Sequence, residues 1–201
     1  MDVARDQPLY TLPARMEKQV YVQERNQKLD RFLASVERQA FRMAAIATRH
    51  NDDALDIVQD TMIKLVEKYA SKPEDEWRPL FFTILQSRIT DYHRKRTLTG
   101  KLFSWIKQGD NDETLEPLDT SESLDGPLEM LMEALTIERL ERALASLPVR
   151  QQQVFLLRTW QGFSVAETAK ILGCGEGSVK THLSRATEAL MNSIEQDVTD
   201  D

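Results

Sequence analysis

Apolar residues recur at steps of three and four along most of the chain, which is the spacing of one face of an α-helix. The clearest stretch is residues 164–191, which reads as two short helices separated by a turn. Its first apolar stripe consists of Val165, Thr168, Ala169 and Leu172, and its second of Val179, Leu183, Ala186 and Leu190. Gly173 is expected to end the first helix and Ser178 to cap the second. The pattern predicts a helix-turn-helix motif.

The second helix of this motif has a polar face opposite its apolar stripe. The face consists of Lys180, Thr181, Ser184, Arg185 and Glu188. Short hydroxyl and long cationic side chains can reach phosphates and base edges in a DNA major groove. A helical hairpin with a solvated polar face is the alternative interpretation. The spacing favours DNA binding.

The same periodicity predicts the rest of the chain to be helical, in two groups. The expected helices cover residues 29–50, 53–69, 80–96, 128–147 and 149–161. Residues 1–26 are polar and contain two prolines, so we expect a loosely ordered arm there. Residues 71–79 are expected to form a polar loop, and the acidic residues 192–201 a frayed tail. The prediction is an all-α fold without strands.

The expected helix over residues 53–69 carries acids on its outer face. Its inner positions are predicted to be Leu55, Val58, Met62, Leu65 and Val66, and its outer positions Asp53, Asp56, Gln59 and Asp60. Acids in a first turn are explained by the helix dipole alone. Asp60 lies deeper in the helix, so an acidic docking face for a basic partner is the second interpretation.

The net charge of −7 conceals two opposite blocks. Residues 77–107 contain seven basic residues and one acid, with aromatic residues between them, a composition that suits a nucleic-acid backbone and unstacked bases. Among these aromatics, Trp77 and Trp105 are expected to be exposed. Residues 108–127 contain seven acids, no bases and two prolines, so they cannot bury enough apolar surface to fold alone. We therefore predict two small helical domains, at 27–107 and 128–191, joined by a flexible acidic linker.

Several classes of protein are disfavoured by what the sequence lacks. One cysteine, Cys174, excludes a disulfide framework or a Cys-rich zinc site. His50, His93 and His182 are far apart and have no ligand neighbours at metal spacing, and no nucleophile motif or phosphate-binding glycine loop is present. We expect no catalytic residue, no metal and no cofactor. Without a signal peptide or an apolar membrane span, the expected location is the cytoplasm.

Taken in order, these features resemble the extracytoplasmic-function (ECF) group of the sigma-70 family of bacterial RNA polymerase initiation factors. The stretch LASLPVRQQQVFLLRTWQGFSVAETAKILGCGEGSVKTHLSRATEAL is similar to region four of that family. The stretch DALDIVQDTMIKLVEKY resembles the polymerase-binding helix of region two, and the helix ending ITDYHRKR resembles its promoter-reading helix. The segment TLTGKLFSWIKQG, with Phe103 and Trp105, lies outside the resemblance.

The resemblance implies partners and site residues. It places Asp56, Gln59 and Asp60 against the clamp helices of the largest polymerase subunit, and apolar surface of region four against the flap of the second-largest. It places Lys180, Thr181, Ser184 and Arg185 on the minus-35 promoter element. The residues that it places on the minus-10 element are Trp77, Thr83, Gln86, Ser87, Thr90, Arg94, Lys95 and Arg96. An anti-sigma factor is a further candidate partner, since sequestration by one is common in the group.

Two departures and one rival hypothesis accompany this interpretation. The family usually has a Trp-Leu-Tyr run where this chain has Leu80, Phe81 and Phe82, and often an Arg-Asn pair where it has Gln86 and Ser87. A minus-10 sequence preference is therefore not carried over. The rival is a dimeric helix-turn-helix regulator that binds duplex DNA without polymerase and uses residues 1–107 as a sensing domain.

Overall fold

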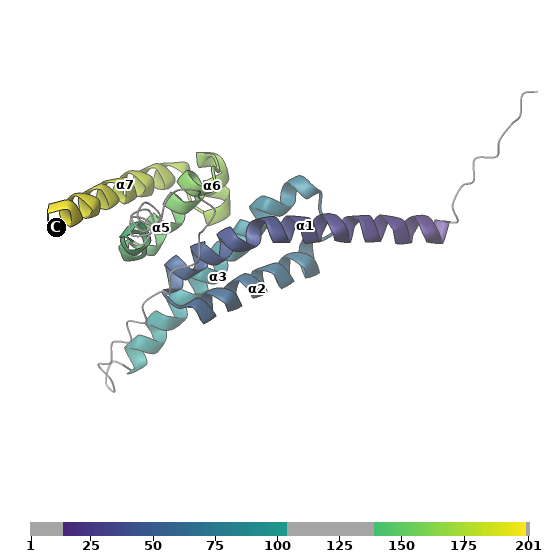
Figure 1. Ribbon diagram of the computed structural model, residues 1–201, viewed down its shortest axis with the longest axis horizontal. Coiled ribbons are helices and arrows are strands. Elements are labelled where there is room, and N and C mark those ends of the chain that lie inside the picture. Colours follow the sequence, from purple (N-terminus) through teal and green to yellow (C-terminus); the bar gives the residue numbers. More distant parts are fainter. Residues whose placement is uncertain (1–13, 104–138, 200–201) are drawn as a thin grey trace, which may run out of the picture.

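The computed structural model describes residues 14–103 and 139–199, and everything in these ranges is helix, turn or short connection. The N-terminal unit consists of α1 (Ala14–Thr48), α2 (Asn51–Tyr69) and α3 (Glu74–Phe103). These three helices lie side by side, and α1 extends well beyond the other two (Figure 1). The all-α prediction is confirmed within the described ranges. The expected linker at 108–127 and Trp105 lie outside them.

Helix α1 begins earlier than the sequence pattern predicts. The expected arm covered residues 1–26, but the chain is helical from Ala14. Residues 22–28 are mostly exposed, so no apolar stripe marks this part of the helix. It is rich in Gln, Glu, Arg and Lys, which all have high helix propensity. Propensity, rather than burial, explains why residues 22–28 are helical.

The predicted loop at 71–79 is also shorter than expected. Helix α3 begins at Glu74, so six of these nine residues are helical and include Pro79. Three acids, Glu74, Asp75 and Glu76, occupy the first turn, where they interact favourably with the helix dipole. Pro73 therefore directly precedes the helix, and Pro79 lies inside it rather than in an extended loop.

The C-terminal unit begins with a helical segment at residues 139–146 and continues through four further elements. These are α5 (Val149–Phe155), the π-helical turn η1 (Leu156–Trp160), α6 (Val165–Leu172) and α7 (Glu176–Thr199). The π turn is closed by the Gln161 N–H bonding to the Leu156 carbonyl, with an N to O distance of 2.9 Å. Gly162, with φ 69°, then redirects the chain toward α6. Helix α7 runs through most of the tail that the sequence predicted to fray.

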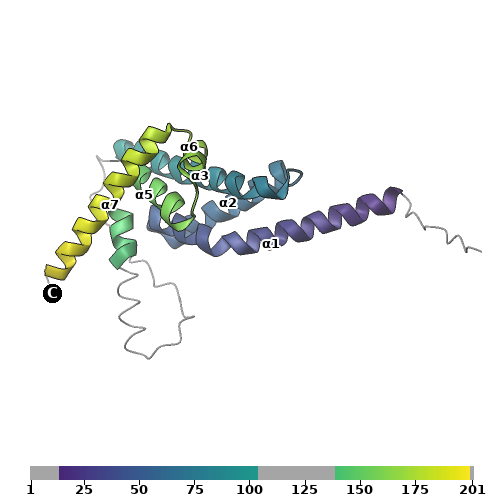
Figure 2. The ribbon, with the colours of Figure 1, turned by 90° about the horizontal axis from the view of Figure 1, so that it is seen from above.

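The two units pack against each other along one side of α3. Helix α6 lies beside α3 in both views (Figures 1 and 2). The buried side chains form one continuous cluster, in which Phe82 of α3 meets Phe163 of the C-terminal unit with ring centroids 5.4 Å apart. Sequence periodicity gave no indication of this contact between the units.

Candidate nucleic-acid and partner interfaces

The helix-turn-helix is fixed by two local caps. At its start, the Ser164 hydroxyl accepts a hydrogen bond from the Glu167 N–H at 3.2 Å, and the Glu167 carboxylate accepts one from the Ser164 N–H at 2.7 Å. This capping box satisfies two backbone donors that the helix itself cannot. It also lowers the pKa of Glu167, mainly because the Ser164 hydrogen bonds favour the carboxylate. At the end of α6, Gly173 takes a left-handed conformation with φ 61°.

Helix α7 follows after a short turn, and it starts before the position that the sequence predicted. Its first residue is Glu176, and the Val179 N–H bonds to the Gly175 carbonyl at 3.2 Å. Ser178 is therefore inside the helix, and its prediction as N-cap is wrong. The predicted inner stripe is confirmed: Val179, Ala186 and Leu190 are buried, and Leu183 is half-buried.

The four residues predicted to contact the minus-35 element share the outer face of α7. Lys180, Thr181, Ser184 and Arg185 are all exposed. The Thr181 hydroxyl donates to the Gly177 carbonyl at 3.0 Å, and its oxygen can still accept a hydrogen bond. The face therefore offers two cations and two hydroxyl groups, the chemistry expected for contacts to phosphates and base edges.

The residues predicted to contact the minus-10 strand lie along α3, but only some of them are exposed to solvent. Thr83, Ser87, Arg94, Lys95 and Arg96 are exposed. Gln86 is 2% exposed and Thr90 is half-buried, because α5 of the C-terminal unit covers both. The Gln153 amide donates to the Gln86 carbonyl at 3.3 Å and to the Thr90 hydroxyl at 3.1 Å. In this arrangement only part of the predicted strand-binding face is accessible.

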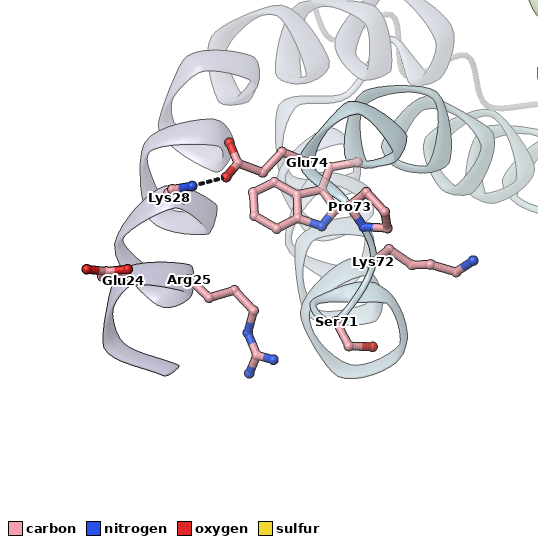
Figure 3. A pocket seen from close by; sticks show the side chains of 8 residues that line it. Glu24, Arg25, Lys28, Ser71, Lys72, Pro73 and Glu74 are labelled. Atoms are coloured by element: carbon pink, nitrogen blue, oxygen red, sulfur yellow. Dashed lines mark ion pairs between the residues drawn. The ribbon is translucent and has the colours of Figure 1, made fainter. Parts of the chain in front are cut away.

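Trp77 is not exposed, contrary to the prediction from the sequence. It is 2% exposed and packs on Phe32 of α1, with ring centroids 5.9 Å apart. Its indole is one wall of a pocket between α1 and the start of α3, about 250 Å³ in volume (Figure 3). An ion pair of 2.5 Å between Lys28 and Glu74 spans the two helices there and raises the pKa of Lys28. The Trp77 ring therefore lines a cavity and is not exposed to solvent.

Arg25 and Ser71 approach the mouth of this pocket from opposite sides. Arg25 comes from the part of α1 that sequence periodicity missed, and its side chain extends toward the connection between α2 and α3 (Figure 3). Its Nε is buried without a hydrogen-bond partner in the described part of the chain. High helix propensity from residue 14 onward is the one sequence signal that could have placed Arg25 beside this loop.

Helix α2 has an exposed apolar stripe as well as its acids. Leu55 and Val66, predicted to face inward, are 46% and 43% exposed, and Ile63 is 55% exposed. The buried side of the helix is instead formed by Ala54, Ile57, Val58, Thr61 and Leu65. Because apolar residues occur on two faces of this helix, periodicity alone could not identify the inner one.

The predicted docking residues border the exposed stripe. Asp56, Gln59 and Asp60 are all exposed, next to Leu55 and Ile63 in helical register. Asp60 lies 3.8 Å from Arg88 of α3, a partly exposed ion pair that leaves much of the carboxylate accessible. A row of half-exposed aliphatic side chains edged by carboxylates is typical of a protein-binding surface.

Two histidines in the described ranges, His50 and His93, have local structural roles. The His50 ring accepts a hydrogen bond from the Asp53 N–H at 3.4 Å and so caps α2. Burial lowers the pKa of His93, which packs edge-on against Tyr92 with ring centroids 5.5 Å apart. Residues 14–103 and 139–199 contain no cluster of three or more possible metal ligands. No helix in the same ranges is long and apolar enough to cross a membrane.

The fold and its surfaces define a helix-turn-helix protein with a second helical unit packed against the first. Two protein-family models match the chain. The model of sigma-70 region 2 matches residues 29–99, and the model of sigma-70 region 4 matches residues 137–190. Together they match more than half of the chain. The chain therefore belongs to the sigma-70 family of RNA polymerase sigma factors, in its ECF group.

Individual relatives agree with this assignment. RNA polymerase sigma factor SigV of Bacillus subtilis is 27% identical over 75% of this chain and 81% of its own length. The ECF sigma factor BldN of Streptomyces coelicolor is 38% identical over 42% of this chain, but the match spans 32% of BldN. Among solved structures, sigma factor RpoE of Bartonella quintana, in complex with the anti-sigma factor NepR, matches with a TM-score of 0.61 and 25% identity, over 88% of this chain and 98% of RpoE.

Proposed function

We propose that this chain is a dissociable initiation factor that joins core RNA polymerase and directs it to promoters with its own minus-35 and minus-10 elements. Residues 27–107 would bind the enzyme and the minus-10 element, and residues 128–191 the minus-35 element. Residues 108–127 would connect the two. Family membership supports the general role, and the described surfaces support the division of tasks.

The observation that carries the proposal is the exposed face of α2. Leu55 and Ile63 remain in solvent although the chain has a well-formed core, and Asp56 and Asp60 stand beside them. Such a surface suits a basic, partly apolar pair of helices, which is the chemistry expected of the clamp helices of the largest subunit. The apolar residues would supply most of the affinity, and the carboxylates would steer and orient the encounter.

The DNA contacts fall on α7 and α3. Lys180, Thr181, Ser184 and Arg185 would read the minus-35 duplex, since all four are exposed on one face. On α3, Thr83, Gln86, Ser87, Thr90 and Arg94 would follow the minus-10 strand, with Lys95 and Arg96 on its phosphates. The pocket beside Trp77 is lined by Ser71, Lys72 and Pro73 of the connection between α2 and α3, and it would receive an extruded base of the minus-10 strand.

The proposal has three further parts. The chain would act without catalysing a reaction, because binding and positioning are all that the assigned surfaces provide. It would work in the cytoplasm, where the polymerase is. An anti-sigma factor would be a regulatory partner and the polymerase flap a second contact, by analogy with the RpoE–NepR complex and with the family.

The direct test is gel filtration of the purified protein with sigma-free bacterial core polymerase at moderate salt and without DNA. We expect co-elution at one to one. Asp56→Ala with Asp60→Ala should weaken co-elution, whereas Arg185→Ala should leave it intact. Tight binding of free protein dimers to duplex DNA, with no binding to core, would restore the regulator hypothesis, which the region 2 match at residues 29–99 now disfavours.

A further inference from the structure

The pocket between α1 and the start of α3 contains two hydrogen-bond donors that nothing in the described part of the chain satisfies. One is the indole N–H of Trp77 and the other is the Nε–H of Arg25. Trp77 is 2% exposed and Arg25 is half-buried, and both line the pocket. A buried donor without a partner costs free energy, so two of them around one cavity indicate a ligand that brings acceptors.

The other two cations at this pocket already have carboxylate partners. Lys28 pairs with Glu74 at 2.5 Å, and this ion pair joins the two helices that form the walls (Figure 3). Lys72 pairs with Glu76 at 3.3 Å. Arg25 is therefore the cationic side chain here that retains an unused donor for a ligand.

The charges around the pocket favour a neutral ligand over a phosphate. The exposed Glu24 and the paired Glu74 both line it, so a dianionic group would meet two carboxylates as well as Arg25. An uncharged ring with carbonyl oxygens meets the donors without that repulsion. Trp77 and Pro73 also line the pocket and give such a ring apolar surface to pack against.

Arg25 reaches this pocket because α1 extends well beyond the first apolar stripe of the chain. Figure 3 shows its side chain leaving α1 toward the connection that carries Ser71. A guanidinium donates through a planar fork of N–H groups. Because the side chain is long and half-buried, it can turn toward a ring in the pocket without disturbing the helix.

We propose that Arg25 and Trp77 form a donor pair that selects an extruded base with a carbonyl oxygen, namely cytosine, thymine or guanine, and rejects adenine. The proposal rests on the proposed function for the arrival of a base in this pocket, and it adds the specificity of that site. A carbonyl oxygen accepts from both N–H groups. Adenine has no carbonyl, and its amino group is a further donor, so it pairs with them less completely.

Base selection is tested on the free full-length protein through the indole N–H signals of its nitrogen-15-labelled tryptophans. Trp77→Phe identifies the Trp77 signal by removing it. Addition of dCMP, dTMP or dGMP should shift this signal downfield, at concentrations about tenfold lower than dAMP requires. Deoxyribose 5-phosphate, which carries the phosphate without a base, should not shift it. Equal shifts with all four nucleotides, or none with any, would overturn the proposal.

The role of Arg25 is tested by Arg25→Met, which removes the donors and keeps a long side chain. Binding of the three carbonyl-bearing nucleotides should weaken about tenfold, whereas binding of dAMP should change little, so the preference disappears. The control is Arg31→Met, because Arg31 is exposed on another face of α1 and should leave the preference intact. A preference that survives Arg25→Met, or an equal loss in both variants, would contradict the assignment.

The same preference is then measured in the complex with core polymerase. The probe is a labelled strand of abasic residues with one central base, followed by fluorescence anisotropy. The thymine strand should bind more tightly than the adenine strand, and Trp77→Phe, which keeps an aromatic ring without the N–H, should narrow the difference. Arg25→Met should narrow it too, which guards against a folding defect at Trp77. Equal binding of both strands by the parent would overturn base selection, whereas failure of the proposed function would appear as loss of co-elution with core polymerase.

Discussion

The exposed stripe of α2 yields a prediction whose size follows from the structure. The change is Leu55→Ala with Ile63→Ala and Val66→Ala. Full burial of such a side chain is worth about 1.5–3 kcal/mol, and roughly half of each is still exposed to solvent. Burial against polymerase should thus contribute about 1 kcal/mol per residue, or about 3 kcal/mol for the three. We expect the triple variant to bind core polymerase about 100-fold more weakly.

The assay is a titration of labelled protein with core polymerase, followed by fluorescence anisotropy. Each replaced side chain is also about half buried within the protein, so the unfolding temperature should fall, in part offset by the high helix propensity of alanine, and circular dichroism checks that the variant is folded at the assay temperature. The matched control is Met191→Ala, which removes an apolar side chain 61% exposed on α7. Binding within threefold of the parent, or an equal loss in the control, would refute the assignment of the stripe to polymerase.

Three further predictions concern other parts of the chain. Arg185→Ala should weaken transcription from a cognate promoter at least tenfold and leave polymerase binding intact, as measured by run-off transcription and co-elution. Ser164→Ala should lower the stability of the helix-turn-helix by about 1 kcal/mol in thermal unfolding, whereas Ser178→Ala, inside α7, should not. Burial keeps the pKa of His93 below its ordinary 6.5, so the folded chain binds this proton less readily than the unfolded chain. Stability is then full above about pH 6.5 and declines below it, and His93→Gln should reduce this decline in urea unfolding.

The sequence predicts those parts of the fold that depend only on residues within one or two helical turns of each other. The stripe that includes Val179 and Ala186 needs only the helical period and a partner on one side, and the left-handed turn at Gly173 needs only a glycine. The helix-turn-helix can therefore be predicted from the local sequence, without information on tertiary contacts. The sequence pattern does not predict the start of α1 at Ala14, because residues 22–28 are polar and form no apolar stripe.

The candidate sites depend more strongly on contacts between distant segments. Trp77 is buried because Phe32, from another helix, lies over it, and Gln86 is buried because Gln153 of the other unit covers it. Neither neighbour can be identified from local periodicity. The residue types on α3 and α7 indicated a nucleic-acid surface, but which of them reach solvent is decided by tertiary packing.

The N-terminal unit has two candidate binding surfaces, the α2 stripe and the polar face of α3, and they differ in how much of them is exposed to solvent. The α2 stripe is open to solvent in the same structure in which α5 lies over Gln86 and Thr90. A partner that docks on the α2 stripe therefore needs no rearrangement of the two units. We expect rapid-mixing experiments with core polymerase to record one phase, whose rate rises in proportion to the polymerase concentration and reaches no plateau.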